Sequence, residues 1–135
     1  MATLVVIEGQ QNGRHFPLTT PIVSVGRDDT CTIQILDEKV SRKHLQVRLE
    51  ASDKRHFAGD YRSANGVFVN NKQIVGDVPL ADGDRVRIGN TTLMYLAADH
   101  ADEAAANAAA KKKKGEWERE TITGSLPGSP GGRGR

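Results

Sequence analysis

The sequence predicts an all-β domain, a sandwich or barrel, followed by a tail that lies outside its core. Short apolar segments rich in β-branched residues recur about every ten residues between positions 2 and 96. Turn-forming pairs such as Asn-Gly and Gly-Asn separate them, and none of these segments has a convincing helical periodicity. From Ala97 the composition changes to alanine and lysine, and then to glycine, proline and serine.

Breakers and alternation define the first five predicted strands. Residues 12–13 are Asn-Gly, a pair that favours a hairpin between the first two strands. Pro21 precedes the third strand and Gly26 ends it. In the fourth and fifth, apolar residues alternate with polar ones, as in strands with one buried face. These strands are expected at Thr3–Glu8, His15–Leu18, Ile22–Val25, Thr32–Leu36 and Leu45–Glu50.

Turn pairs also define the second half of the domain. Asn65-Gly66 separates two apolar segments, and Gly89-Asn90 joins the last two in a hairpin. The strands are expected at His56–Tyr61, Val67–Val69, Lys72–Ile74, Arg85–Ile88 and Thr91–Leu96. About a hundred residues can bury a two-sheet core but not a large cavity. We therefore predict a domain over residues 1–98.

The rest of the chain is expected to be linker and tail. Residues 99–115 are rich in alanine, with acidic residues first, lysines late and glycine at the end, which favours a helix. The segment has no large apolar residue, so we expect a solvated, partly helical linker that does not pack on the sandwich. Residues 116–135 are polar and then rich in Gly, Pro, Ser and Arg, which predicts disorder.

Composition excludes several classes of function. A net charge of +2 is too small to indicate a nucleic-acid partner. Cys31 is the only cysteine, so no intrachain disulfide can form, and no set of side chains has metal-ligand spacing. We expect no metal or cofactor. The first residues do not resemble a signal peptide, and no apolar segment approaches membrane-spanning length. A cytoplasmic protein without a membrane partner is expected.

Three polar clusters each follow or precede a predicted strand. They are Gly26-Arg27, Ser41-Arg42-Lys43-His44 and Asn65-Gly66. Arg27, Ser41 and Arg42 together supply two fixed cations and a hydroxyl, which suit a phosphate group. No nucleophile–base pair or catalytic carboxylate pair accompanies them, so an enzyme is not expected.

The order and spacing of these clusters resemble the forkhead-associated (FHA) domain. The matching positions are Gly26-Arg27, Ser41-Arg42-x-His44, Asp60-x-x-Ser63-x-Asn65-Gly66-x-x-Val69-Asn70 and Leu80-x-Asp82-Gly83-Asp84-x-Val86-x-Ile88-Gly89. The resemblance extends over about residues 3–96 and is densest over 23–76. It implies a β-sandwich of eleven strands that binds phosphothreonine peptides through the loops at one end.

The resemblance also implies roles for single residues. Arg27, Ser41 and Arg42 would contact the phosphate, and Asn65 would bond the main chain of the peptide. Gly26, His44 and Gly66 would shape the loops. The family often has a threonine directly before the asparagine, where this chain has Ala64. Only the backbone N–H of Ala64 could then donate, so we expect weaker phosphate binding.

We therefore expect a non-catalytic adaptor or regulator in Ser/Thr-kinase signalling. Its partner would be a protein carrying phosphothreonine, such as a Ser/Thr kinase or its substrate. One alternative is a scaffold that binds proteins through the sandwich face without phosphate. Another is polyanion binding through Lys111–Lys114 and the Gly-Arg tail, which predicts a steep salt dependence.

The tail also contains two candidate phosphorylation sites. Thr121 and Thr123 follow acidic residues. A flexible linker of about 24 residues spans roughly 27 Å, compared with a radius of gyration of about 13 Å for the domain. We therefore hypothesise that either threonine, once phosphorylated, binds the loops of its own domain or of a second copy.

Overall fold

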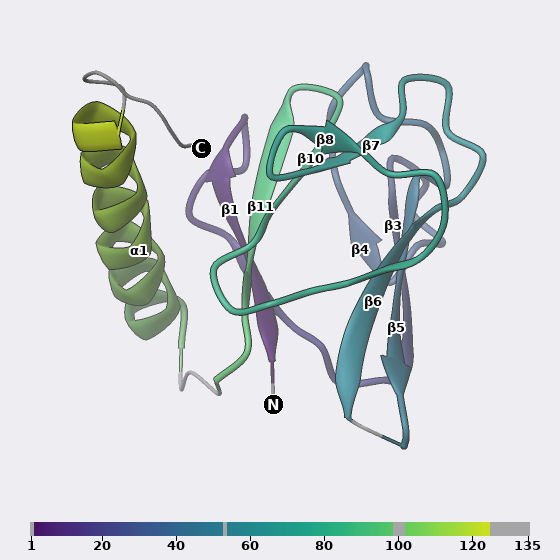
Figure 1. The fold of residues 1–135 in the computed structure, drawn as a ribbon. Coiled ribbons are helices and arrows are strands. Elements are labelled where there is room, and N and C mark those ends of the chain that lie inside the picture. The colour runs from purple at the N-terminus through teal and green to yellow at the C-terminus, as the bar shows by residue number, and fades with distance from the viewer. Residues whose placement is uncertain (1, 53, 99–101, 125–135) are drawn as a thin grey trace.

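The computed structural model describes residues 2–52, 54–98 and 102–124, and side-chain surroundings up to residue 113. Two β-sheets face each other, and one helix packs on the outer face of the larger sheet (Figure 1). The larger sheet has the order β2-β1-β11-β10-β7-β8, and the smaller has the order β4-β3-β5-β6-β9. The resemblance to an eleven-stranded sandwich is thereby confirmed.

The strands of the larger sheet lie near the predicted positions. In sheet order they are β2 (His15–Pro17), β1 (Thr3–Glu8), β11 (Thr91–Leu96), β10 (Arg85–Ile88), β7 (Val67–Val69) and β8 (Lys72–Gln73). The pairings that join them are antiparallel. The hairpin expected at Gly89-Asn90 joins β10 to β11, where Ile88 pairs with Thr91.

The smaller sheet contains the one strand that the sequence did not predict. Its strands are β4 (Ile33–Gln34), β3 (Ile22–Gly26), β5 (Leu45–Glu50), β6 (Arg55–Asp60) and β9 (Val78–Pro79). β9 is short and ends in proline, which is tolerated because the strand lies at the edge, paired only with Phe57 and Ala58 of β6. β4 is shorter than expected and pairs in parallel with β3.

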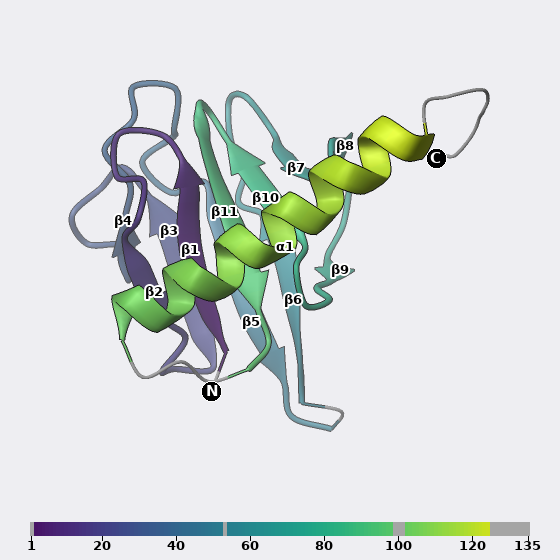
Figure 2. The same ribbon diagram turned by 90° about the vertical axis from the view of Figure 1, so that its left-hand side faces the viewer.

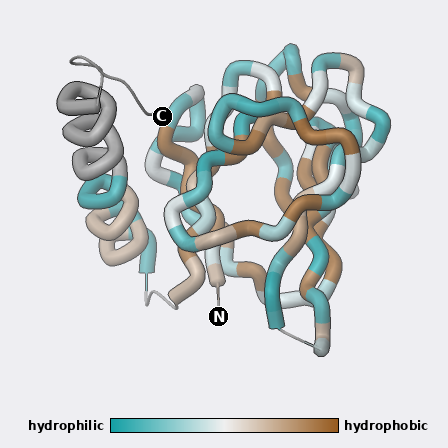
Figure 3. The backbone as a smooth tube through the Cα atoms, in the orientation of Figure 1, coloured by the Kyte–Doolittle hydropathy of each residue, from teal (hydrophilic) through white to brown (hydrophobic). Residues whose placement is uncertain are grey.

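Alternation places one face of each sheet in the core. Val25, Leu45 and Val47 of the smaller sheet are at most 1% exposed, and so are Ile88 and Leu93 of the larger sheet. Along the chain, apolar residues coincide with the strands that face each other, and polar residues with the connecting loops (Figure 3). Because the core holds the strands, their loop ends are fixed relative to one another.

Helix α1 (Glu103–Gly124) corrects two predictions about the tail. Its Ala106 and Ala110 are fully buried against Val5, Met94 and neighbouring apolar residues on the outer face of β1 and β11. The helix runs diagonally across that face (Figure 2). The expectation that this segment stays off the sandwich is therefore wrong. Alanine's small side chain lets the helix backbone approach the sheet closely, so a large apolar residue is not required.

Polar contacts fix the first half of α1. Asp102 accepts a hydrogen bond from the Ala105 N–H at the helix start, an N-capping contact. Asn107 Nδ2 donates to the Gly13 carbonyl at 2.6 Å, and Lys113 Nζ lies 2.7 Å from Asp82 Oδ2. The helix continues past Gly115, so the helix end expected there is wrong, and residues 116–124 are helical. Residues 125–135 of the expected disordered tail lie outside the described residues.

Within the described ranges, no helix has both the length and the apolar character needed to cross a membrane.

Candidate phosphate-binding loops

Three loops meet at one end of the sandwich: those between β3 and β4, between β4 and β5, and between β6 and β7. Arg27 N–H donates to the Ser41 carbonyl at 3.0 Å, and Asp28 N–H donates to the Arg42 carbonyl at 3.1 Å. A Cβ atom on Gly26 would overlap the Arg42 carbonyl oxygen, so this close approach requires glycine. The glycine expected to shape the loops therefore lies where two of them touch.

Arg27 is held along one edge of its guanidinium group. Its Nε–H donates to the Val40 carbonyl at 3.0 Å. Among the described residues, its two Nη atoms make no further hydrogen bond, and the side chain is exposed. The outward edge thus offers several N–H donors in a fixed plane, the geometry that suits two oxygens of a phosphate.

His44 connects two loops from a fully buried position. Its Nδ1 accepts a hydrogen bond from the Ser41 N–H at 2.9 Å, so Nε2 carries the hydrogen and donates to the Gly66 carbonyl at 2.7 Å. Gly66 has a φ of +85°, a conformation that glycine adopts without strain. Both partners of His44 are main-chain groups, so the ring sets the spacing of the two loops.

Ser41 and Ala64 contact each other across the same gap. The Ala64 N–H donates to Ser41 Oγ at 3.0 Å, which leaves the hydroxyl hydrogen of Ser41 free to donate outward. The Ala64 N–H, expected as a separate donor, is therefore already used to orient Ser41. Ala64 adds no hydroxyl at this position.

Asn65 is partly engaged within the protein. Its Nδ2 donates to the Lys39 carbonyl at 2.8 Å, which joins the β6–β7 loop to the β4–β5 loop. Among the described residues, its Oδ1 has no hydrogen-bond partner. The side chain can still accept a hydrogen bond from the main chain of an extended peptide.

Arg42 supplies the second cation of this loop end. Its side chain is exposed and makes no hydrogen bond within the described residues. Its carbonyl accepts hydrogen bonds from Asp28 N–H and from the Cys31 thiol. The pKa of Asp28 is lowered, first by hydrogen bonds from the Thr30 N–H and hydroxyl and further by the charge of Arg42.

Asp37 is a site residue that sequence reasoning did not find. Its carboxylate accepts hydrogen bonds from the N–H groups of Lys39 and Asn90 and from the Thr91 hydroxyl, each at 2.8–2.9 Å. Partial burial raises the pKa of Asp37, but these hydrogen bonds outweigh it, so that the pKa is lowered overall. The contact with Lys39 follows a local Asx-turn pattern, whereas nothing local signals the contact with the β10–β11 turn.

Two polar residues shape the β6–β7 loop itself. Asp60 Oδ1 accepts from the Ser63 N–H at 2.8 Å, and Ser63 Oγ accepts from the Gly66 N–H at 2.9 Å. The sequence pattern included both positions without assigning them a role. Within the ranges that the structure describes, no cluster of His, Cys, Asp and Glu could hold a metal ion.

Comparisons with known proteins agree with this geometry. A family model for the FHA domain matches residues 23–89. The chain is 37% identical over 107 residues to the glycogen accumulation regulator GarA of Mycolicibacterium smegmatis, an alignment that covers 79% of this chain and 66% of that protein. The chain therefore spans slightly less than two thirds of that relative's length.

Two solved structures are similar in fold and sequence. The FhaA FHA domain, complexed with the intracellular domain of Rv3910, superposes with a TM-score of 0.62 and 30% identity, covering 70% of this chain and 99% of that one. Mycobacterium tuberculosis EmbR, in complex with a low affinity phosphopeptide, superposes with a TM-score of 0.66 and 28% identity. The match covers 75% of this chain and 25% of that one. Together with the family model, these likenesses show that the chain belongs to the FHA family of non-catalytic, phosphothreonine-binding domains.

Proposed function

We propose that the loop end of this protein binds the phosphate of a phosphothreonine through Arg27, Ser41 and Arg42. The observation that carries the proposal is the position of Arg27, whose Nε is fixed by the Val40 carbonyl while both Nη atoms stay available. A phosphothreonine has about −1.5 to −2 charges and three acceptor oxygens. Two arginines and the Ser41 hydroxyl match this charge and these acceptors.

The peptide main chain would bind at Asn65. Its Oδ1 accepts an N–H of the extended peptide, while the contact with Lys39 keeps the side chain in place. Gly26, His44 and Gly66 hold the loops at the required spacing. Because Ala64 brings no hydroxyl, we expect an affinity near micromolar, or about −8 kcal/mol.

The biological role follows from this chemistry. An FHA domain without catalytic groups acts by bringing a phosphorylated protein to another partner, so we infer an adaptor or regulator in cytoplasmic Ser/Thr-kinase signalling. The name of the GarA relative and the phosphopeptide complex of EmbR support this proposal. The partner is a phosphothreonine protein, such as a kinase or its substrate.

A tethered ligand is a finer form of the same proposal. Thr121 and Thr123 fall within α1, and their side chains lie outside the described part of the chain. Phosphorylated, either threonine could serve as the ligand of its own domain or of a second copy once the last turns of the helix open. NMR shift changes at Arg27, Ser41 and Asn65 on phosphorylation would support this, and unchanged loop signals would contradict it.

The decisive experiment measures peptide binding by fluorescence anisotropy. A library of phosphothreonine peptides should include binders near micromolar affinity, whereas the same peptides with threonine should not bind. Arg27→Ala should reduce affinity at least about 30-fold, because it removes charge-assisted hydrogen bonds. Arg55→Ala, which removes an arginine from the far end of β6, is the matched control and should bind normally. Equal binding by the Arg27 variant would favour phosphate-independent binding instead.

A further inference from the structure

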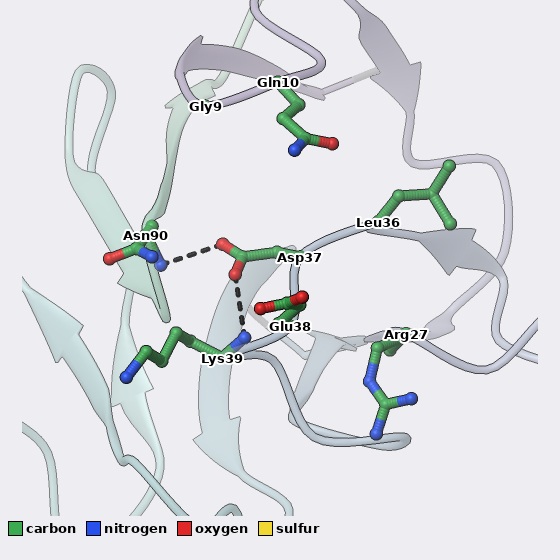
Figure 4. A pocket seen from close by; sticks show the side chains of 8 residues that line it. All are labelled: Gly9, Gln10, Arg27, Leu36, Asp37, Glu38, Lys39 and Asn90. Carbon is green, nitrogen blue, oxygen red and sulfur yellow. Dashed lines mark hydrogen bonds between the residues drawn. The ribbon is translucent and has the colours of Figure 1, made fainter.

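An open cavity of about 550 Å³ lies directly beside Arg27 (Figure 4). Gly9 and Gln10, after β1, form one wall, and Asn90 in the β10–β11 turn forms another. Residues 36–39 of the β4–β5 loop form the floor. The cavity thus adjoins the proposed phosphate site but is built from two further loops.

Hydrogen bonds between these loops fix the walls of the cavity. Asp37 joins the floor to the β10–β11 turn through the Asn90 N–H and the Thr91 hydroxyl. On the other side, the Leu36 N–H donates to Gln11 Oε1 at 2.8 Å. The cavity is therefore bounded by loops that hydrogen bonds connect to one another.

The cavity offers a carboxylate, side-chain amides and an apolar surface to a ligand. Within the described residues, the exposed Glu38 carboxylate has no ion pair or hydrogen bond, and the side-chain amides of Gln10 and Asn90 have no hydrogen bond. Leu36 leaves 54% of its surface exposed beside them. An apolar surface next to a carboxylate and amide oxygens suits a long side chain with an aliphatic stem and a cationic head.

Two cationic side chains, Arg27 and Lys39, also line the cavity. Arg27 would be neutralised by the phosphate, which adds further negative charge nearby. Lys39 extends away from Arg27 and Leu36, toward the opposite side of the cavity (Figure 4). With phosphate bound, the region between Glu38, Leu36 and Arg27 is therefore the negative part of the cavity.

We propose that this cavity is a second recognition subsite that binds an arginine or lysine side chain of the phosphorylated partner. The proposal rests on the proposed phosphothreonine site at Arg27. The Leu36 surface packs on the aliphatic stem, and Glu38 pairs with the charged head. The preferred partner is thus a phosphothreonine protein with a basic residue near the phosphorylated position.

Peptide scanning tests the subsite. A phosphothreonine peptide is varied at each flanking position to arginine, alanine or glutamate, and Kd is measured with the full chain at low salt. At one position, arginine should bind about three- to tenfold tighter than alanine, and glutamate should bind weaker. Glu38→Lys should reverse this order at that position alone, so that the glutamate peptide becomes the better one.

Asp29→Asn is the matched control, because it removes an exposed acid near the phosphate loops that does not line the cavity. It should leave the arginine preference unchanged. Absence of any such preference, or an equal loss of preference in the Asp29 variant, would overturn the subsite while phosphopeptide binding persists. Failure of every phosphopeptide to bind in an Arg27-dependent way would instead reject the phosphothreonine site.

Discussion

The two ends of the sandwich each contain a buried histidine, but the two rings have different partners. At the loop end, His44 bonds two main-chain groups, the Ser41 N–H and the Gly66 carbonyl. Toward the other end, His56 Nδ1 lies 2.8 Å from the Tyr95 hydroxyl, a contact between side chains of the two sheets. His44 satisfies backbone groups of two loops, whereas His56 adds a side-chain link between β6 and β11, which belong to different sheets.

This difference teaches where the molecule depends on single side chains. Loops leave backbone groups that must be satisfied by something other than a neighbouring strand. At the loop end that requirement falls on His44, Ser41, Ser63 and Asp37. At the other end, side chains also accept hydrogen bonds from loop N–H groups, as Asp82 does from Ala97 and Asp84 from Ala81, but these loops are not the ones that meet at Arg27. A side-chain change there should therefore not reach the proposed binding loops.

The largest effect is expected from His44→Ala. The change leaves the Ser41 N–H and the Gly66 carbonyl without their partner and opens a cavity, so the free energy of unfolding should fall by about 3–5 kcal/mol. Urea denaturation measures it, and phosphopeptide titration should show a weaker Kd in the folded fraction. A loss below about 1 kcal/mol with intact binding would contradict the role assigned to His44.

Asp37→Asn should have the next largest effect. The amide cannot accept as many charge-assisted hydrogen bonds from Lys39, Asn90 and Thr91, so we expect a loss of about 1–3 kcal/mol. Thermal or urea unfolding gives the value. Glu38→Gln, the neighbouring acid without a partner among the described residues, is the control and should change stability by less than about 0.5 kcal/mol. Equal losses in both variants would show that charge alone, rather than the hydrogen bonds, matters here.

A smaller effect is expected from His56→Phe. The ring volume is kept while the bond to the Tyr95 hydroxyl is lost, so stability should fall by about 1 kcal/mol and phosphopeptide affinity should not change. Tyr95→Phe should cost a similar amount, and the double variant less than the sum of the two. Altered peptide binding in either single variant would mean that the two ends are coupled.

The same histidine predicts a pH dependence. Burial lowers the pKa of His56 below the ordinary value of 6.5, so the unfolded chain binds a proton that the folded chain does not. The free energy of unfolding should therefore decrease as pH falls from about 6.5 toward the folded pKa of His56. Comparing wild type with His56→Phe across this range isolates the contribution, and identical pH slopes would contradict it.

The smallest effect is expected on α1. Lys113→Ala removes the ion pair with Asp82. Both side chains of this pair are partly exposed, so the free energy of unfolding should fall by at most about 1 kcal/mol, and by less at high salt. Lys111→Ala, an exposed lysine of the same helix, should change nothing. Phosphopeptide affinity should be unaffected by both variants, since the helix lies on the sheet face and not on the loops.

Much of this structure could be predicted from sequence. Alternating segments and turn pairs located ten strands, because residues such as Ile33 and Ile35 carry the two-residue period locally. The edge strand Val78–Pro79 was not predicted, because two residues are too few to show an alternation of apolar and polar positions. The packing of α1 on the sheet was not predicted, because small alanine side chains such as Ala106 do not by themselves indicate a buried face. The packing depends on the matching apolar strip on β1 and β11.

In the candidate site, too, some features could be predicted from the sequence and others depend on the fold. Arg27, Ser41 and His44 could be chosen as candidates because their spacing forms a pattern along the chain. The contacts of Asp37 with the β10–β11 turn, and of Asn65 with the Lys39 carbonyl, depend on loops brought together by the sandwich. The use of the Ala64 N–H by Ser41 likewise appears only once the two loops are side by side.

The alanine face of α1 determines whether a shortened fragment of the protein stays soluble. Without the helix, Val5, Ile7, Met94 and Leu96 would form a continuous apolar strip on the outside of the larger sheet. Strips of this kind drive self-association. A fragment ending at residue 98 would keep the binding loops yet tend to aggregate, so the unit to express reaches at least to Lys113.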